Sequence, residues 1–413
     1  MSEIGGSFIE GRDAGSRSRN VSSVVMLVFS DHGGLADYAH EQACELVRRG
    51  VDLTVLCKKR FAAEREGAPY GVRCLFVANP KRIRAKRLRQ IVVALLVVLN
   101  EWIAAGYIAL HQPKAALKDG FSELMAPFWF FPHLLLDRFF GVTYAVDLHD
   151  PDRKRVFGPQ WWHQLSVRAA YAMNRILLVH DARAKGIELA PQRAAVVEVP
   201  HGIFPLAQSR GELAPSGFQL RAKLGIPQRA PLLLSFGFIA DRKNIDFVIR
   251  ALAAVPDACL LVVGRVASTR DRSVDQYAEL ARQVGVADRV FFEERFVSDH
   301  EVASYFQSAD GILLTYKSEF VSQSGVLHLA ANWDKPVLAS GGHGPLTETV
   351  ARHNLGIVVE PDSVGALADG LTRLVSGRYP ALGWAGFREA ASWKVNIDSF
   401  LDALARSAAP AAA

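Results

Sequence analysis

Two adjacent cations, Arg242 and Lys243, stand between an apolar run and a segment with helical periodicity. The run is residues 232–237 and ends in Gly237, and the helical segment is residues 245–254. A helix N-terminus offers unpaired N–H groups and about half a positive charge, so cations beside it make a strong anion site. The pattern predicts that a phosphate or diphosphate binds here. The alternative is a pair of solvated loop charges, the usual fate of Lys and Arg.

Two glycine turns offer further backbone donors for an anion. Gly33 and Gly34 follow an apolar run at residues 24–29, and Ser324 and Gly325 stand where another helical segment opens. Glycine lets a ligand approach backbone N–H groups closely, and Ser324 adds a hydroxyl. An ordinary tight turn is the alternative interpretation of each glycine, because that is its commoner role in loops.

Apolar runs that alternate with amphipathic segments predict the elements that position these residues. The alternation is typical of parallel, doubly wound sheets, which bind ligands at the carboxyl ends of their strands. His149 directly follows one expected strand, so we expect it in a ligand site; the alternative is a loop histidine that caps a neighbouring backbone group. The expected strands are residues 24–29, 53–57, 72–77, 107–111, 143–148, 176–180, 195–199, 232–237, 260–264, 290–292 and 312–315.

The length of 413 residues, half of them hydrophobic, exceeds what one core normally supports. We therefore predict an α/β chain with two doubly wound, Rossmann-like domains. The expected parts are a tail at residues 1–20, a first domain at 21–205, a linker at 206–217, a second domain at 218–386, a helix at 387–407 and a tail at 408–413.

The cysteines and the first residues indicate a cytoplasmic protein. Cys44, Cys57, Cys74 and Cys259 form no CxxC pair, which favours free thiols in a reducing compartment. Residues 1–20 are polar and lack the apolar segment of a signal peptide, and we expect them to be disordered.

The order of these motifs resembles a known family. Gly237 precedes Lys243 by six residues, and Ser324 and Gly325 open a helix before an apolar run at residues 337–340. Residues 31–38, 147–150 and 200–202 agree with it in the first half. Over roughly residues 23–393 the chain resembles a GT-B glycosyltransferase, with two Rossmann-like domains facing across a cleft. It is most similar to the retaining family 4 (group 1) enzymes.

The resemblance implies a nucleotide-diphosphate sugar as donor and assigns roles to residues. Lys243 and Arg242 would stabilise the diphosphate, His149 would contact the donor sugar's hydroxyls, and the helix at 387–407 would cross back to the first domain. Catalytic residues are then Lys243, Arg242, His149 and Glu319. Donor and phosphate contacts are Gly33, Gly34, Gly237, Ser322, Ser324 and Gly325, and nucleotide contacts are Gly264, Phe296 and Val297.

The chain departs from the family pattern at three positions. Phe238 stands where an arginine usually follows the first glycine, and Val321 and Leu329 stand where two glutamates usually lie. Glu319 lies two residues upstream of the first of these, and residues 322–324 offer hydroxyl and amide groups in its place. The donor's identity therefore does not follow from the family.

Asp150 and Asp152 spell the Asp-x-Asp pattern by which the other main transferase fold, GT-A, holds a metal. A GT-A enzyme has one nucleotide-binding domain, whereas this chain offers two and a lysine suited to the diphosphate. We therefore predict no metal site and no cofactor.

Residues 79–89 carry six cations ahead of an apolar run at residues 91–99. Asn79 as N-cap and Pro80 in the first turn predict a helix that starts here. Arg82, Lys86 and Arg89 would share one face, and an anionic membrane surface would offset their unfavourable place at a helix start.

Two other interpretations of this stretch stay open. It could be a core helix with a solvated basic end, or it could bind nucleic acid, for which no recognised fold is present. The apolar run is interrupted by Asn100 and Glu101, which predicts a segment too short to span a bilayer. We expect peripheral association with the inner face of the cell membrane and no nucleic-acid partner.

The favoured function is transfer of a sugar to a lipid-linked or glycan acceptor, as in bacterial-type surface polysaccharide or glycolipid synthesis. One alternative is a non-catalytic GT-B relative that binds a nucleotide sugar or a partner enzyme. Another is a nucleotide-sugar epimerase, which would need acid and base carboxylates in the cleft.

Overall fold

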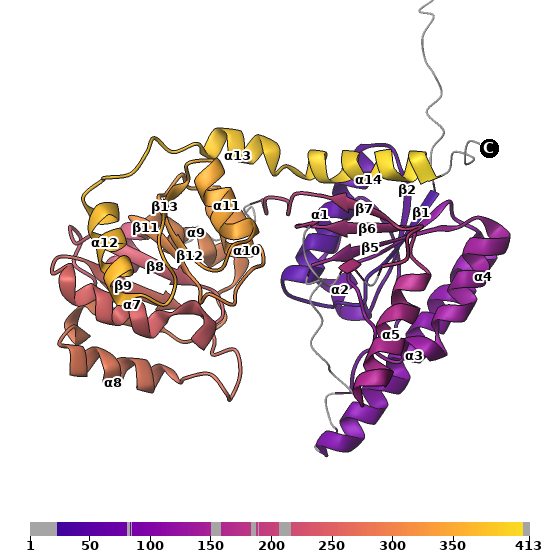
Figure 1. Cartoon of the computed structure of the whole chain (residues 1–413), viewed down its shortest axis with the longest axis horizontal. Helices are drawn as coiled ribbons and strands as arrows, with labels where there is room; N and C mark the ends of the chain where they lie inside the picture. The colour runs from indigo at the N-terminus through magenta and orange to yellow at the C-terminus, as the bar shows by residue number, and fades with distance from the viewer. Residues whose placement is uncertain are drawn as a thin grey trace, which may run out of the picture.

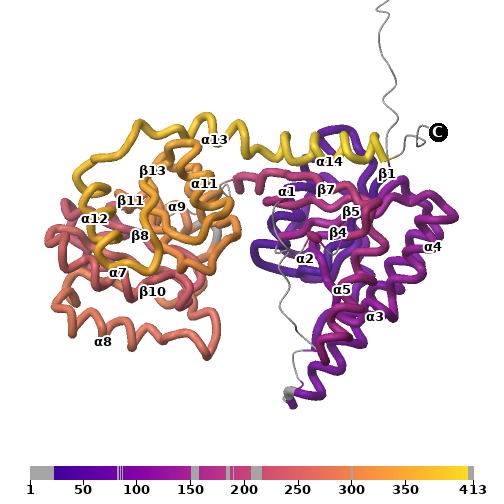
Figure 2. The backbone as a smooth tube through the Cα atoms, in the orientation of Figure 1, coloured from indigo at the N-terminus to yellow at the C-terminus, as the bar shows by residue number. Residues whose placement is uncertain are grey.

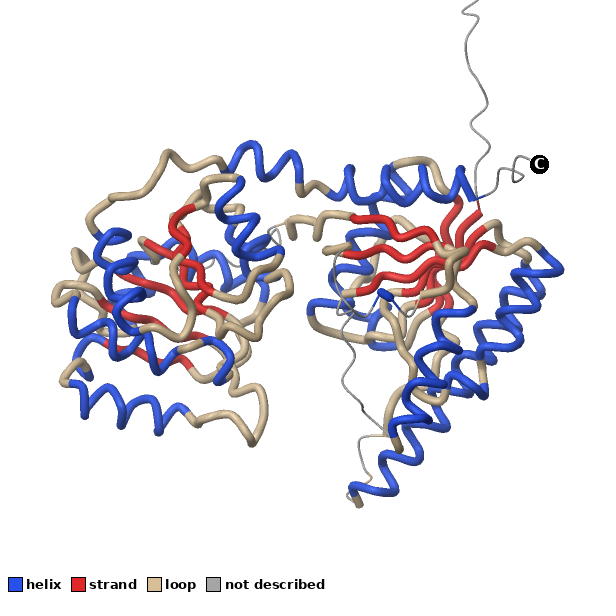
Figure 3. The backbone as a smooth tube through the Cα atoms, in the orientation of Figure 1, coloured by secondary structure: helices blue, strands red, loops and turns tan. Residues whose placement is uncertain are grey.

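The computed structural model describes residues 23–80, 83, 85–149, 158–182, 187–188, 190–205 and 216–407. They form two α/β domains, each built on one parallel sheet and drawn at the right and left of Figure 1. This confirms the predicted fold class. In both domains helices lie on the two faces of the sheet (Figure 3).

The amino-terminal domain has a seven-stranded parallel sheet in the order β3-β2-β1-β4-β5-β6-β7. Its central strands are continuous runs of buried apolar residues, because both faces of the sheet are covered. The strands are β1 Ser23–Leu27, β2 Asp52–Leu56, β3 Gly71–Arg73, β4 Ala115–Lys118, β5 Thr143–Leu148, β6 Ile176–Val179 and β7 Ala195–Glu198.

Alternate residues of β1 divide this domain into two cores. Val24 and Met26 pack with the helices on one face, and Val25 and Leu27 pack with those on the other. The first face carries α1 Gly34–Arg48 and α2 Lys59–Glu64; the second carries α3 Lys86–His111, α4 Phe130–Phe140 and α5 Gln160–Ala172, with the short turn η1 Ala126–Phe128.

The carboxyl-terminal domain has a six-stranded parallel sheet in the order β10-β9-β8-β11-β12-β13, the Rossmann arrangement. Its strands are β8 Leu232–Phe236, β9 Cys259–Val263, β10 Val290–Glu293, β11 Gly311–Thr315, β12 Val337–Ser340 and β13 Gly356–Val358. Its helices are α6 Gly217–Lys223, α7 Ile245–Ala251, α8 Val274–Val284, α9 Asp299–Ser308, α10 Gly325–Ala330, α11 Pro345–Arg352 and α12 Val364–Val375, with short turns η3 Asp241–Lys243, η4 Leu252–Ala254 and η5 Ala287–Arg289.

The end of the chain returns to the first domain as two helices, α13 Trp384–Ala390 and α14 Trp393–Ser407 (Figure 2). Asn396 of α14 donates from Nδ2 to the Tyr38 hydroxyl (2.7 Å) and to the Pro200 carbonyl (2.8 Å). Trp393 donates from Nε1 to the Ile203 carbonyl (2.7 Å). The predicted single helix at 387–407 is thus two, and the second packs on α1.

The strand predicted at residues 107–111 is wrong, because these residues form the last turn of α3. Short apolar runs fit a strand or a buried helix equally well. The strand in that part of the sheet is β4, whose sequence Ala-Ala-Leu-Lys has little β-propensity. Its position between β1 and β5 buries it completely and overrides that propensity.

The predicted helix start at Asn79 and Pro80 is also wrong, because α3 begins at Lys86. The Asn100 side chain accepts from the Val77 N–H (2.8 Å) and donates to the Val77 carbonyl (3.0 Å). These two bonds hold the incoming chain beside the helix. Another boundary differs as well: α6 begins at Gly217, inside the predicted linker.

Candidate functional site

Lys243 lies at the carboxyl end of β8, where the chain turns at Gly237. Its Nζ donates to the carbonyl of Phe236 (2.5 Å), and a Cβ on Gly237 would lie 3.4 Å from it. Gly264, which follows β9, has φ of +145°, and a Cβ there would lie 2.0 Å from the Gly237 carbonyl oxygen. Only glycine fits at Gly264, so the ends of β8 and β9 can approach closely.

The Lys243 ammonium group is buried. Its side chain is 8% exposed, and this burial lowers its pKa to about 7, with repulsion from Arg242 as a second cause. Within the described part of the chain no carboxylate pairs with this cation, so its charge is uncompensated there and an anion that reaches it stabilises the charged form. Arg242, its neighbour in the turn η3, is exposed to solvent.

The loop after β11 is fastened to the Lys243 turn. The Lys317 N–H donates to the Arg242 carbonyl (2.9 Å). Asp362 joins the two loops, because its carboxylate accepts from Nδ2 of Asn244 (3.0 Å) and from the Ser318 N–H (3.0 Å). These bonds hold its pKa below the usual value although partial burial opposes them. Sequence reasoning missed Asp362, since it lies far from both loops along the chain.

Ser324 and Gly325 of the second domain lie close to His201 of the first domain. The buried Ser324 hydroxyl pairs with the Tyr316 hydroxyl (3.1 Å), and the Ser324 carbonyl accepts from Nδ1 of His328 (3.1 Å). A Cβ on Gly325 would lie 4.0 Å from Cε1 of His201, which belongs to the amino-terminal half. The rings of His201 and His328 are 4.6 Å apart.

Four further predicted residues lie in the loops that surround this site. Glu319 is exposed and Ser322 is partly buried, both between β11 and α10. Phe296 is exposed and Val297 is buried, both after β10. Their predicted contacts with donor and nucleotide stay predictions.

The glycine turn of the first domain is held by a buried carboxylate. Asp119, directly after β4, accepts from the N–H groups of Phe29 (3.1 Å) and Ser30 (3.0 Å). Burial raises its pKa to about 6, although these two bonds oppose the shift. The loop then reaches Gly33 and Gly34, which are exposed and open α1. Sequence reasoning missed Asp119, because its partners lie about ninety residues away.

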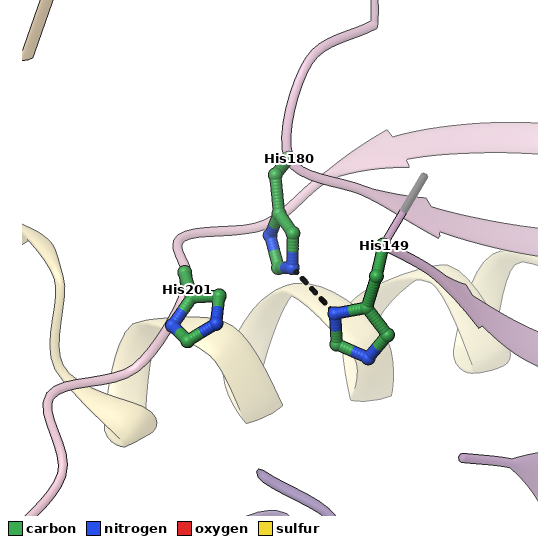
Figure 4. A group of neighbouring side chains, drawn as sticks. All are labelled: His149, His180 and His201. Carbon is green, nitrogen blue, oxygen red and sulfur yellow. Dashed lines mark hydrogen bonds between the residues drawn. The ribbon is translucent and has the colours of Figure 1, made fainter. Parts of the chain in front are cut away.

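Three histidines gather where β5, β6 and β7 end (Figure 4). His149 was predicted at this edge, and the strand order places His180 and His201 beside it. Nε2 of His180 lies 3.2 Å from Nδ1 of His149, and one ligand nitrogen from each of the three lies within 4.8 Å of the others. His180 also donates from Nδ1 to the Val199 carbonyl (3.0 Å).

Two imidazoles at this edge, His201 and His328, are held in the neutral form by their surroundings. Burial, and then His328, His180 and His149, lower the pKa of His201 well below its usual range. Burial lowers the pKa of His328 to about 3. The ring of the buried Tyr38 meets that of His149 edge to face at 4.6 Å. Neutral imidazoles can accept a hydrogen bond from a sugar hydroxyl or bind a metal ion.

The residues predicted to meet a membrane are only partly described. Arg82, together with Asp150 and Asp152 of the Asp-x-Asp pattern, lies outside the described residues. Lys86 begins α3, and Arg89 is exposed in its first turn.

An apolar surface covers the outer side of α3 and α4, which lie side by side in Figure 1. The exposed residues of α3 recur every three or four positions, which makes one helical stripe. The surface consists of Leu88, Ile91, Leu95, Leu99 and Trp102 of α3 with Phe131, Leu135, Phe139 and Phe140 of α4. By length and composition alone, residues 87–111 could cross a bilayer, and 33% of their most apolar stretch is buried.

Comparison with known proteins agrees with this geometry. Residues 218–385 match the family described as Glycosyl transferases group 1. The D-inositol 3-phosphate glycosyltransferase of Xylanimonas cellulosilytica is 32% identical over 193 residues, which cover 46% of this chain and 45% of that protein. The match thus spans about half the length of this relative. The protein of the same name from Mycolicibacterium gilvum is 25% identical over 397 residues, which cover 92% of this chain and 86% of that protein.

A solved structure shows the same fold over most of the chain. HepE of Anabaena in complex with UDP superposes with a TM-score of 0.66 at 16% identity, over 93% of this chain and 99% of that one. The same protein has also been solved in complex with UDP-glucose, with a TM-score of 0.63. The chain therefore has the GT-B fold, and its residues 218–385 match the glycosyl transferases of group 1.

Proposed function

We propose that this protein transfers a sugar from a nucleotide-diphosphate sugar to a lipid-linked or glycan acceptor, with retention of configuration and without a metal ion. The process would be bacterial-type surface polysaccharide or glycolipid synthesis. The observation that carries the proposal is the buried, uncompensated Lys243 beside the glycine-lined ends of β8 and β9. The relatives named for glycosyl transfer and the UDP complexes of HepE support it.

The chemistry follows from the charge that develops when the donor breaks. Cleavage of the sugar–phosphate bond leaves a nucleoside diphosphate, and groups already aimed at it lower the barrier. Lys243 supplies a point charge, and the turn at Gly237 lets the phosphates approach the backbone. Nε2 of His149 can accept from a hydroxyl of the donor sugar when its Nδ1 carries the proton, as the bond to His180 allows.

Nucleoside diphosphates provide the first test. UDP, GDP and ADP should raise the melting temperature in proportion to ln(1 + [L]/Kd), and one of them should do so most strongly. The matching nucleotide sugar should then be consumed with an acceptor present, and EDTA should leave this activity unchanged. Binding without turnover would favour the non-catalytic alternative. Release of a free epimeric nucleotide sugar would favour the epimerase, and loss of activity in EDTA that Mg²⁺ or Mn²⁺ restores would overturn the metal-free proposal.

We further propose that the protein lies on the inner face of the cell membrane through the apolar surface of α3 and α4. If α3 spanned the bilayer, Asn100 and Glu101 would lie in its hydrocarbon core. Instead, Glu101 is buried against the sheet, where it pairs with Lys118 (2.5 Å) and with His133 (3.2 Å). These contacts tie the middle of the helix to the domain. The exposed apolar residues on its outer side can insert into a lipid surface.

Vesicle co-sedimentation tests this placement. The protein should pellet with anionic vesicles and much less with neutral ones, because each cation near the surface contributes on the order of 1 kcal/mol. Replacing Arg82, Lys86 and Arg89 by glutamine should release it, and so should high salt. The control is the same change at Arg282, Arg352 and Arg373 of the other domain. Equal release by both triple variants, or equal binding to neutral vesicles, would contradict a specific basic contact.

A further inference from the structure

Three histidines lie at the ends of β5, β6 and β7, although a single contact with the donor sugar requires only one of them. We propose that His149, His180 and His201 bind a divalent transition-metal ion of the Zn²⁺ type. The proposal adds a site that sugar transfer does not need. Only its last consequence, inhibition of transfer, rests on the function proposed above.

The spacing of the nitrogens suits one metal ion. Zn²⁺ binds imidazole nitrogens at about 2.0–2.1 Å in tetrahedral geometry, which puts two ligand nitrogens about 3.3 Å apart. His149 and His180 hold theirs 3.2 Å apart, and the metal would replace the proton that now joins them. His149 would then carry its proton on Nε2. The nitrogen of His201 already lies within 4.8 Å of both, so a rotation of its side chain brings it into range.

Backbone carbonyls fix the orientation of these rings. His180 donates from Nδ1 to Val199 (3.0 Å), and His201 donates from Nδ1 to its neighbour Gly202 (3.3 Å). A carbonyl oxygen can only accept, so each neutral ring must present an unprotonated Nε2. Metal-binding histidines are typically held in this way, because the second bond fixes the tautomer and the ring orientation.

A fourth imidazole comes from the other domain. The ring of His328 in α10 lies 4.6 Å from that of His201, and its Nδ1 likewise donates to a carbonyl, that of Ser324 (3.1 Å). A site of three histidines with a fourth nearby favours Zn²⁺, Co²⁺ or Ni²⁺ over Mg²⁺ or Ca²⁺, which prefer oxygen ligands. His149, His180 and His201 are only partly buried, so an ion can reach them.

Metal binding would compete with the donor. Nε2 of His149, the proposed acceptor for a sugar hydroxyl, would be protonated once Nδ1 holds the ion, so it could no longer accept that hydrogen bond. Zn²⁺ should therefore inhibit transfer, and EDTA should restore it. This accords with a transferase that needs no metal for its chemistry.

Co²⁺ titration of the full chain tests the site without any substrate, through the intense visible absorption of tetrahedral Co²⁺. One equivalent should bind and be displaced by Zn²⁺, and excess Mg²⁺ should not displace it. His180→Ala and, separately, His201→Ala should weaken binding by roughly 10–100-fold or more. The control His111→Ala removes an exposed histidine at the end of α3 and should bind like the native protein.

The outcomes separate the site from the catalytic proposal. Far-UV circular dichroism of the two variants verifies that they are folded. Absence of the Co²⁺ band in the native protein, or an equal band in both folded variants, overturns the metal site whether or not the protein transfers sugar. Inhibition by Zn²⁺ that His180→Ala relieves supports the competition, and unchanged turnover at saturating Zn²⁺ overturns it.

Discussion

The two sheets carry different chemistry at the same edge. In the carboxyl-terminal domain the strands end in glycines and a buried lysine, which suits a diphosphate. In the amino-terminal domain they end in three clustered histidines and a buried ion pair, and an apolar helical surface lies beside them. The family match covers residues 218–385, the first of these regions. The family match thus falls on the domain proposed to bind the donor, whereas the histidines and the apolar surface lie outside the matched residues.

The largest effect should come from the buried ion pair of the amino-terminal domain. Lys118 and His133 outweigh burial and hold the pKa of Glu101 below its usual range, so Glu101 is ionised in the core. Glu101→Gln leaves Lys118 buried without its counter-charge, and the free energy of unfolding should fall by about 3–5 kcal/mol. Urea unfolding followed by circular dichroism measures this.

The control for that prediction is Glu64→Gln. Glu64 accepts from Arg60 at a similar distance (2.7 Å), but this pair is exposed, and its loss should cost no more than about 1 kcal/mol. Equal losses in the two variants would mean that burial does not set the strength of the Glu101 network.

The lysine of the carboxyl-terminal domain should matter for ligands and little for folding. Lys243→Met keeps the volume of the side chain and removes its charge, so nucleoside diphosphate affinity should fall by about 1.5–3 kcal/mol. The fold should keep its stability, because a cation whose pKa is lowered by burial is not stabilising the core. Calorimetric titration measures the affinity, with Lys223→Met, an exposed lysine of α6, as control. Equal affinities of Lys243→Met and the native protein would refute the assigned role.

The lowered pKa of Lys243 also predicts proton uptake on binding. With a pKa of about 7, Lys243 is mostly neutral at pH 8 in the free protein, and a bound diphosphate raises its pKa. Binding at pH 8 should therefore take up close to one proton, and affinity should fall by at most about tenfold per pH unit above pH 7. Below pH 6 the lysine is already charged and uptake should vanish.

Titration in two buffers of different ionisation enthalpy measures the uptake. Lys243→Arg is the matched control, because a guanidinium stays charged and should take up no proton. Uptake of the same size in this variant would assign the proton to another group.

Sequence predicted what depends on local pattern. The runs at residues 232–237 and 312–315 became β8 and β11 because fully buried strands are continuously apolar. His149 was found because it follows such a run. His180 and His201 follow runs too, but their meeting with His149 depends on the order β5-β6-β7, which a single sequence does not state.

What sequence missed depends on long-range contacts. The sequence Ala-Ala-Leu-Lys forms strand β4 only because β1 and β5 enclose it. Asp119 and Asp362 accept hydrogen bonds from loops that are distant in sequence, so no local sequence pattern identifies them. The chain that leads into α3 is held at Val77 by Asn100, which lies 23 residues later.

The smallest effect on stability should come from the apolar surface of α3 and α4. Leu95 is 61% exposed and Phe139 is 72% exposed, so serine at both positions should change the free energy of unfolding by no more than about 0.5 kcal/mol each. Ile108→Ala, on the buried face of α3, is the contrasting variant and should cost about 2–5 kcal/mol. The serine variant should nevertheless bind anionic vesicles more weakly, because the two most exposed side chains of the apolar surface are gone while the cations remain. Unchanged vesicle binding in a stable serine variant would leave the basic residues as the only membrane contact and would remove the apolar surface from the proposal.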